Sequence, residues 1–231
     1  MIDWIKNIFE KREEREILKW ETNDSILEFL LQNIDNKGTL KECAQTLPDE
    51  KKSEDEIKFV PGLMDAMLSV DDSEESKTRI KKLTELIRKV SKYGDEQSKS
   101  DFYREITENQ GVIGIIDEFL QKLVQLSLPV KPYLFKYANN LATKTNNRNS
   151  VKFGIAIIGL CQNKKPIENL KILGLHEEFT VFSTIALSYL SNNLIQDLWQ
   201  LAKKVNGWGK IQIVDRLAEM DLPDVIIDWL V

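Results

Sequence analysis

The chain has 231 residues, a formal net charge of −5, and a composition that is 42% hydrophobic and 30% charged. These values are typical of a globular protein and exclude a chain that is disordered throughout. No window approaches the roughly 18 consecutive apolar residues of a membrane span, the first residues lack the apolar core of a signal peptide, and two distant cysteines do not make a disulfide framework. We therefore expect a cytoplasmic protein with no membrane partner.

Residues 1–100 are expected to form an irregular helical part that precedes a more regular part at 101–231. The spacing of apolar residues predicts helices at 2–20, 26–34, 40–47, 61–69 and 73–92. The first of these mixes acids with bases on its polar face, which favours docking on neighbouring helices over a membrane surface. The charged run 49–58 is predicted to be a mobile surface linker, and the polar residues 97–101 a second connector that separates the two parts.

Three helices are predicted in the middle of the chain, at 101–108, 112–128 and 133–145. The second has a stripe of apolar residues that is expected to be buried, namely Ile113, Ile116, Phe119, Leu120, Leu123 and Leu126. Pro132 is suited to the first position of the third helix. Leu134, Ala138 and Leu141 share one face of that helix and are expected in the core.

From Val151 onward the sequence repeats with a period of thirty residues, and each unit contains two helical patterns. The core-facing positions of the first helix in each unit are Phe153, Ile157 and Leu160, then Ser183, Leu187 and Leu190, then Ile213, Leu217 and Met220. Pro166 and Pro223 are predicted to start second helices. Because neither helix buries its stripe alone, the units are expected to stack on one another.

The last residues, VIIDWLV, are apolar and end without a helix cap. We expect either that the natural chain continues beyond Val231 or that a second copy covers this end by self-association.

The stretches VFSTIALSYL and NGWGKIQIVDRLAE resemble HEAT-like and armadillo-like helical repeats, and NGWGKIQIVDRLAE in particular is similar to bacterial HEAT-like proteins with no settled function. The resemblance covers roughly residues 130–231, whereas residues 1–128 match only as generic helices. It implies an all-α fold with a right-handed α-α superhelix, a solenoid, that binds a partner on its concave face. It implies no reaction.

Charge is distributed unevenly, because residues 119–175 contain nine Lys or Arg and a single acid, Glu168, between two acidic ends of the chain. One candidate binding face is expected here, and it comprises Tyr133, Lys136, Tyr137, Asn140, Lys144, Arg148 and Lys152. The favoured function is a non-catalytic scaffold that binds a protein or peptide, acidic in character, on this face. The same charges could instead complement the acidic N-terminal half of the chain, or be a plain solvated face.

The alternative function is nucleic-acid binding by the basic segment 119–175, with Lys on phosphates and Tyr stacked on bases. The acidic character of the whole chain argues against it.

No catalytic or metal-binding constellation is found, so the protein is expected not to be an enzyme and to need no cofactor. His176 is the only histidine, which excludes a two-His, one-carboxylate site built from this chain alone. We interpret His176 as a turn residue and Cys161 as a small core residue. Trp208, between two glycines, is expected to fill the gap between adjacent units, with a stacking platform for a ligand as the alternative.

Overall fold

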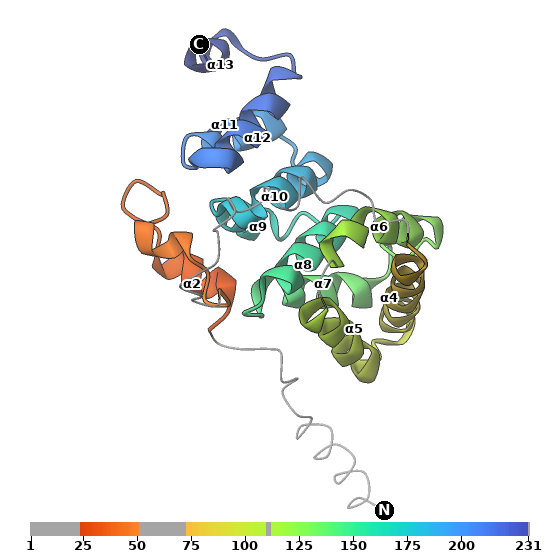
Figure 1. Ribbon diagram of the computed structural model, residues 1–231. Helices are drawn as coiled ribbons and strands as arrows, with labels where there is room; N and C mark the ends of the chain where they lie inside the picture. Colours follow the sequence, from red (N-terminus) through yellow and green to blue (C-terminus); the bar gives the residue numbers. More distant parts are fainter. Residues whose placement is uncertain (1–23, 51–72, 110–111, 231) are drawn as a thin grey trace, which may run out of the picture.

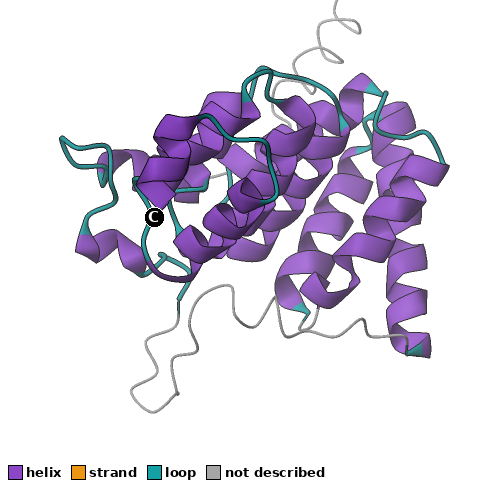
Figure 2. Ribbon diagram, turned by 90° about the horizontal axis from the view of Figure 1, so that it is seen from above, coloured by secondary structure: helices purple, strands orange, loops and turns teal. Residues whose placement is uncertain are grey.

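The computed structural model describes residues 24–50, 73–109 and 112–230, and this part of the chain is all-α (Figure 1). It contains eleven α-helices and two short 3-10 helices, joined by loops and with no strand among the described residues (Figure 2). The predicted all-α class is therefore confirmed. The predicted helices 2–20 and 61–69 lie outside the described residues. Among the helices that are described, none combines the length and the apolar character that crossing a membrane requires.

The α-helices are, in chain order, α2 (Ile26–Gln32), α4 (Glu74–Tyr93), α5 (Glu96–Glu108), α6 (Ile116–Gln125), α7 (Pro132–Thr143), α8 (Arg148–Leu160), α9 (Ile167–Leu173), α10 (Glu177–Leu190), α11 (Leu194–Ala202), α12 (Gly207–Ala218) and α13 (Asp224–Leu230). The 3-10 helices are η1 (Glu42–Gln45) and η2 (Val112–Ile115). The predicted helix 40–47 is thus a single 3-10 turn.

Side-chain caps set the start of several helices. Ser25 Oγ accepts a hydrogen bond from the Glu28 backbone N–H at 3.2 Å, and Ser73 caps α4 in the same way. Asp95 accepts from the Ser98 backbone N–H at 2.8 Å and so starts α5 at Glu96. The prediction of a connector at 97–101 is therefore wrong, because a polar run that follows an N-cap forms the solvated face of a helix.

The two predicted parts of the chain share one core. Phe102 of α5 contacts Phe119 of α6, Tyr137 of α7 and Phe153 of α8, with ring centroids 5.8 to 5.9 Å apart. The predicted division at residue 100 falls inside α5, whose buried residues belong to this shared core.

The middle of the chain differs from prediction in one helix. Instead of one helix at 112–128, a 3-10 turn leads into α6, which ends at Gln125. Ser127 has a positive φ of 54°, and the Leu128 backbone N–H closes the turn on the Leu123 carbonyl. Leu126 is consequently exposed rather than part of the buried stripe.

Beyond residue 147 longer helices alternate with shorter ones, since α8, α10 and α12 are followed by the shorter α9, α11 and α13. The longer helices begin at residues 148, 177 and 207, close to the predicted period. α8 packs against α7 on one side and α10 on the other, and α10 packs in turn against α12 (Figure 1).

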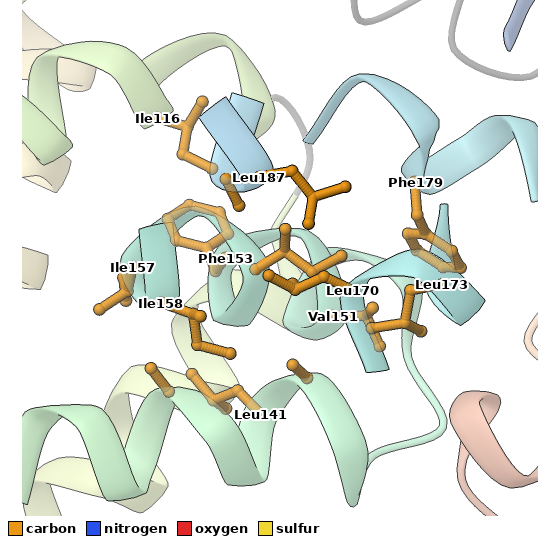
Figure 3. Close-up of a cluster of buried hydrophobic side chains, with 14 of the residues drawn as sticks. Ile116, Leu141, Val151, Phe153, Ile157, Ile158, Leu170, Leu173, Phe179 and Leu187 are labelled. Carbon is orange, nitrogen blue, oxygen red and sulfur yellow. The ribbon is translucent and has the colours of Figure 1, made fainter. Parts of the chain in front are cut away.

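The predicted core-facing positions of these helices are buried or packed against the core. Seven of the nine are buried, while Leu160 and Met220 are half-buried at the edge of the core. Figure 3 shows Phe153, Ile157 and Leu187 among the buried side chains of this region.

Close helix packing depends on two glycines. A Cβ built on Gly154 would lie 2.5 Å from the Ala142 backbone N, so α7 and α8 approach only because this position has no side chain. A Cβ on Gly209 would lie 2.8 Å from Thr180 Oγ1, which places the same requirement on α10 and α12.

The N-terminal segment 24–50 lies against the second half of the chain, because α2 packs on α9 and on α7. The Ile26 backbone N–H donates to the Thr145 carbonyl at 2.9 Å. Ile26, Leu30 and Leu47 of this segment are buried in the common core.

Candidate functional site

The predicted binding face on α7 and α8 is not a continuous surface. Tyr137 is buried, and its hydroxyl donates to the Lys99 carbonyl at 2.7 Å. Burial raises the pKa of this phenol well above its ordinary value. The assignment of Tyr137 to a binding surface is therefore wrong, because α5 covers this side chain: its ring lies 5.9 Å from that of Phe102, centroid to centroid.

Lys152 is also buried, so its assignment to the face is wrong as well. Its Nζ lies 2.6 Å from Glu178 Oε1, and only 2% of the residue is exposed. Burial alone would raise the pKa of Glu178, but Lys152, Arg148 and His176 outweigh it and lower that pKa. This ion pair joins α8 to α10 within the core.

Arg148 connects the same cluster to the N-terminal segment. Asp49 Oδ2 accepts from the Arg148 backbone N–H at 2.8 Å and from its Nε at 3.2 Å. Glu50 and Glu178 lie 3.6 and 3.8 Å from the guanidinium. Burial lowers the pKa of Arg148, but these carboxylates outweigh it and raise that pKa. A mobile linker is predicted at 49–58; residues 51–58 lie outside the described residues, whereas Asp49 and Glu50 pair with Arg148 at the start of α8.

His176 completes this charged cluster as the N-cap of α10. It is buried, and its Nδ1 accepts a hydrogen bond from the Glu178 backbone N–H at 3.2 Å. Burial lowers the pKa of His176 to about 4, against the opposing effects of Glu178 and the Gln45 backbone. The imidazole is therefore neutral and structural near pH 7.

The other predicted face residues have mixed environments. Tyr133, Lys136 and Lys144 are exposed on α7 or at its end, and Asn140 is half-buried. Of the predicted face, only the residues on α7 and at its end other than Tyr137 remain accessible. Arg148 and Lys152 form ion pairs with acidic residues of the same chain.

An apolar groove between α6, α8 and α10 is the most distinctive surface feature of the described residues. Its volume is about 510 Å³. Ala156, Gly159 and Ala186 are the small residues of its lining, on α8 and α10. The larger apolar side chains of the lining are Ile116, Leu120 and Val124 of α6, Leu160 of α8, and Phe182, Ile185 and Tyr189 of α10. Its polar residues are Asp117, Gln121 and Gln125, all on α6.

Several of these lining side chains are exposed although they are large and apolar. Tyr189 is 66% exposed, Val124 55% and Ile185 43%. Contiguous exposed apolar surface of this kind marks interaction sites in folded proteins.

A second hollow, of about 260 Å³, lies between α10 and α12, and Ile185 lines both this hollow and the groove. The charged residues of the second hollow are Asp215, Arg216 and Glu219, all on α12 or at its end. Thr184 Oγ1 and Arg216 Nε are buried there without a hydrogen-bond partner among the described residues.

Sequence reasoning missed this groove, although a signal was present. Phe182, Ile185 and Tyr189 form a second apolar stripe on the helix 177–190, at i, i+3 and i+7, apart from the stripe of Ser183, Leu187 and Leu190. Two residues of this second stripe, Ile185 and Tyr189, are exposed, so no helix of the described chain covers them.

The remaining sequence candidates are structural. Cys161 packs against the core, and burial raises the pKa of its thiol to about 12, far from a reactive thiolate. Trp208 is half-buried in the first turn of α12 instead of a loop. In the part of the chain that the structure describes, no three His, Cys, Asp or Glu residues converge as metal ligands.

Comparison with known proteins finds no match for this chain among protein families, curated sequences or solved structures.

Proposed function

We propose that this protein is a non-catalytic scaffold of HEAT-like helical repeats that binds a segment of a partner protein in the groove between α6, α8 and α10. The spacing of α8, α10 and α12, which begin at residues 148, 177 and 207, supports the repeat assignment. The observation that carries the binding function is the groove itself, with its small and large apolar lining residues and a volume of about 510 Å³.

The shape and chemistry of the groove suit a helix better than an extended peptide. Insertion of the apolar face of an amphipathic helix into a hydrophobic groove is a common mode of peptide recognition. One mode of extended-peptide binding, the addition of a strand to a sheet edge, is not open to the described part of this chain, which contains no sheet. The partner segment would replace the missing neighbour of the second stripe on α10.

The test is the binding of a fluorescently labelled amphipathic helical peptide with an apolar stripe and an uncharged polar face, measured by anisotropy. Ile185→Asp places a charge in the groove, and we expect it to weaken binding at least tenfold. Leu31→Asp on α2 is the matched control, because Leu31 is 44% exposed and Ile185 43%. Equal affinities for the two variants would exclude the groove, and no binding at all would reject the proposed function.

The same preparation tests nucleic-acid binding, the alternative function of the basic segment. Mixed-sequence DNA and RNA are titrated at two salt concentrations. Binding that weakens steeply with salt would support the alternative. We expect none, since Tyr137 and Lys152 are buried and Arg148 is paired with acids of its own chain.

A further inference from the structure

The charges along the groove define which kind of helix it accepts, and this inference rests on the proposed function. Three acidic residues line the groove and the adjoining hollow. Asp117 of α6 lines the groove, and Asp215 of α12 and Glu219 just after α12 line the hollow. All three are exposed. Arg216 is the one cation among the lining residues of the two hollows.

The α12 end of the groove concentrates this negative charge. α12 ends at Ala218, with Asp215 in its last turn and Glu219 as its C-cap. The C-terminus of a helix carries the negative end of the helix dipole, where cationic side chains are stabilising and acids are not. Two acids at this position are therefore unfavourable for the isolated fold, and only Arg216 opposes them.

These acids also differ from the other acids described above. Asp49, Glu50 and Glu178 are paired with cations at distances of 2.6 to 3.8 Å. For Asp117, Asp215 and Glu219, no cation lies within ion-pair distance among the described residues. Their negative potential is therefore directed to solvent and to whatever occupies the groove.

We propose that the groove binds an amphipathic helix whose apolar stripe is followed by basic residues, and that these basic residues pair with Asp215 and Glu219. The stripe contacts Val124, Ile185 and Tyr189, while the basic end lies over the C-terminus of α12. Adjacent packed helices are about 8–10 Å apart, so a helix of about 16 residues, about 24 Å long, spans the groove. An acidic partner, expected from the basic segment, does not fit this site.

Three synthetic helical peptides of about this length test the proposal, with one apolar stripe and with Lys, Gln or Glu at the flanking positions. We expect the Lys peptide to bind at least tenfold more tightly than the Glu peptide at low salt, and the difference to shrink as salt is raised. The double variant Asp215→Asn/Glu219→Gln should remove the Lys preference and leave the affinity for the Gln peptide unchanged. The charge-matched control is Glu28→Gln/Glu42→Gln, because both residues are exposed acids of the N-terminal segment, on α2 and η1.

Each outcome decides one question. Equal binding of all three peptides, or tighter binding of the Glu peptide, would overturn the inference and leave the proposed function standing. A Lys preference that survives the Asp215/Glu219 variant, or that the Glu28/Glu42 control also removes, would overturn the assignment to these two acids. Failure of every peptide to bind would reject the proposed function itself.

Discussion

At the scale of single residues, three ionisable side chains are buried together at the start of α10, namely Lys152, His176 and Glu178. A buried charge is tolerated only when it is paired, because desolvation of an ion costs several kcal/mol. Lys152 and Glu178 satisfy this condition, because Lys152 Nζ and Glu178 Oε1 lie 2.6 Å apart. His176 avoids the cost because its imidazole is neutral.

The depressed pKa of His176 predicts a loss of stability in mild acid. The folded state holds this pKa at about 4, below the ordinary 6.5. Between these two pH values the unfolded chain binds a proton that the folded chain does not, so stability falls as pH decreases from 6.5 toward 4. We expect a loss of about 2 kcal/mol between pH 7 and pH 5, measured by urea denaturation.

The variant His176→Asn isolates this effect, since Asn keeps a side-chain oxygen for the N-cap and does not titrate. Its unfolding free energy should change little between pH 7 and pH 5. Titration of Glu178 contributes little to the change in unfolding free energy between pH 7 and pH 5. Its lowered pKa contributes stability that is lost only as pH falls below its ordinary 4.5. Parallel pH profiles for the variant and the natural sequence would contradict the assignment to His176.

At the scale of elements, close packing of α7 on α8 is decided by one position. Gly154 carries no Cβ, and an added one would approach the backbone of Ala142 at 2.5 Å and the Ala138 carbonyl at 2.8 Å. Neither atom is the flexible end of a side chain, so the two helices would have to separate. Their separation would disturb the core that Phe153 and Tyr137 share with Phe102.

Gly154→Ala should therefore destabilise the protein by about 2–3 kcal/mol, although Ala is favoured over Gly in a helix by about 1 kcal/mol. Gly159→Ala on the same helix is the comparison, because its Cβ would meet Ala186 at the milder distance of 3.1 Å. Thermal and urea denaturation of both variants measure the difference. A Gly154→Ala variant as stable as the natural sequence would show that α7 and α8 can separate without cost.

At the scale of the whole molecule, residues 24–50 are held to the second half of the chain by a few long-range contacts. Asp49 and Arg148 are 99 positions apart in sequence and form the charged part of this attachment. The backbone hydrogen bond from Ile26 to Thr145 and the packing of α2 on α9 form the rest. The basic segment is thus, at Arg148, a complement to acids of the N-terminal half.

Arg148→Met should loosen this attachment more than it destabilises the rest of the fold. Hydrogen exchange measured by mass spectrometry should show faster exchange in residues 24–50, with α8 to α12 little affected. The expected cost is about 1–3 kcal/mol, the contribution of hydrogen bonds to a charged group. Arg104→Met is the control, since among the described residues Arg104 pairs only with its helical neighbour Asp101. Uniform loss of protection along the chain would mean that Arg148 supports the whole fold and not this attachment.

The sequence by itself determined where most of the helices lie, because their signals are local, although it missed the start of α5 and the end of α6. Caps such as Ser25 and Ser73, and stripes such as Leu134, Ala138 and Leu141, depend on residues within a few positions. The core-facing positions of α8, α10 and α12 could be predicted for the same reason. The period of thirty residues repeats one local pattern.

Tertiary structure alone decided which polar and apolar side chains reach solvent. Tyr137 and Lys152 lie on plausible surface positions of their own helices, and they are buried because α5 packs over Tyr137 and α10 over Lys152. Ile185 and Tyr189 have the opposite outcome, since no helix of the described chain covers them. Exposure depends on helices that are far away in sequence, so the groove and the acidic residues beside it could be identified only from the packed structure.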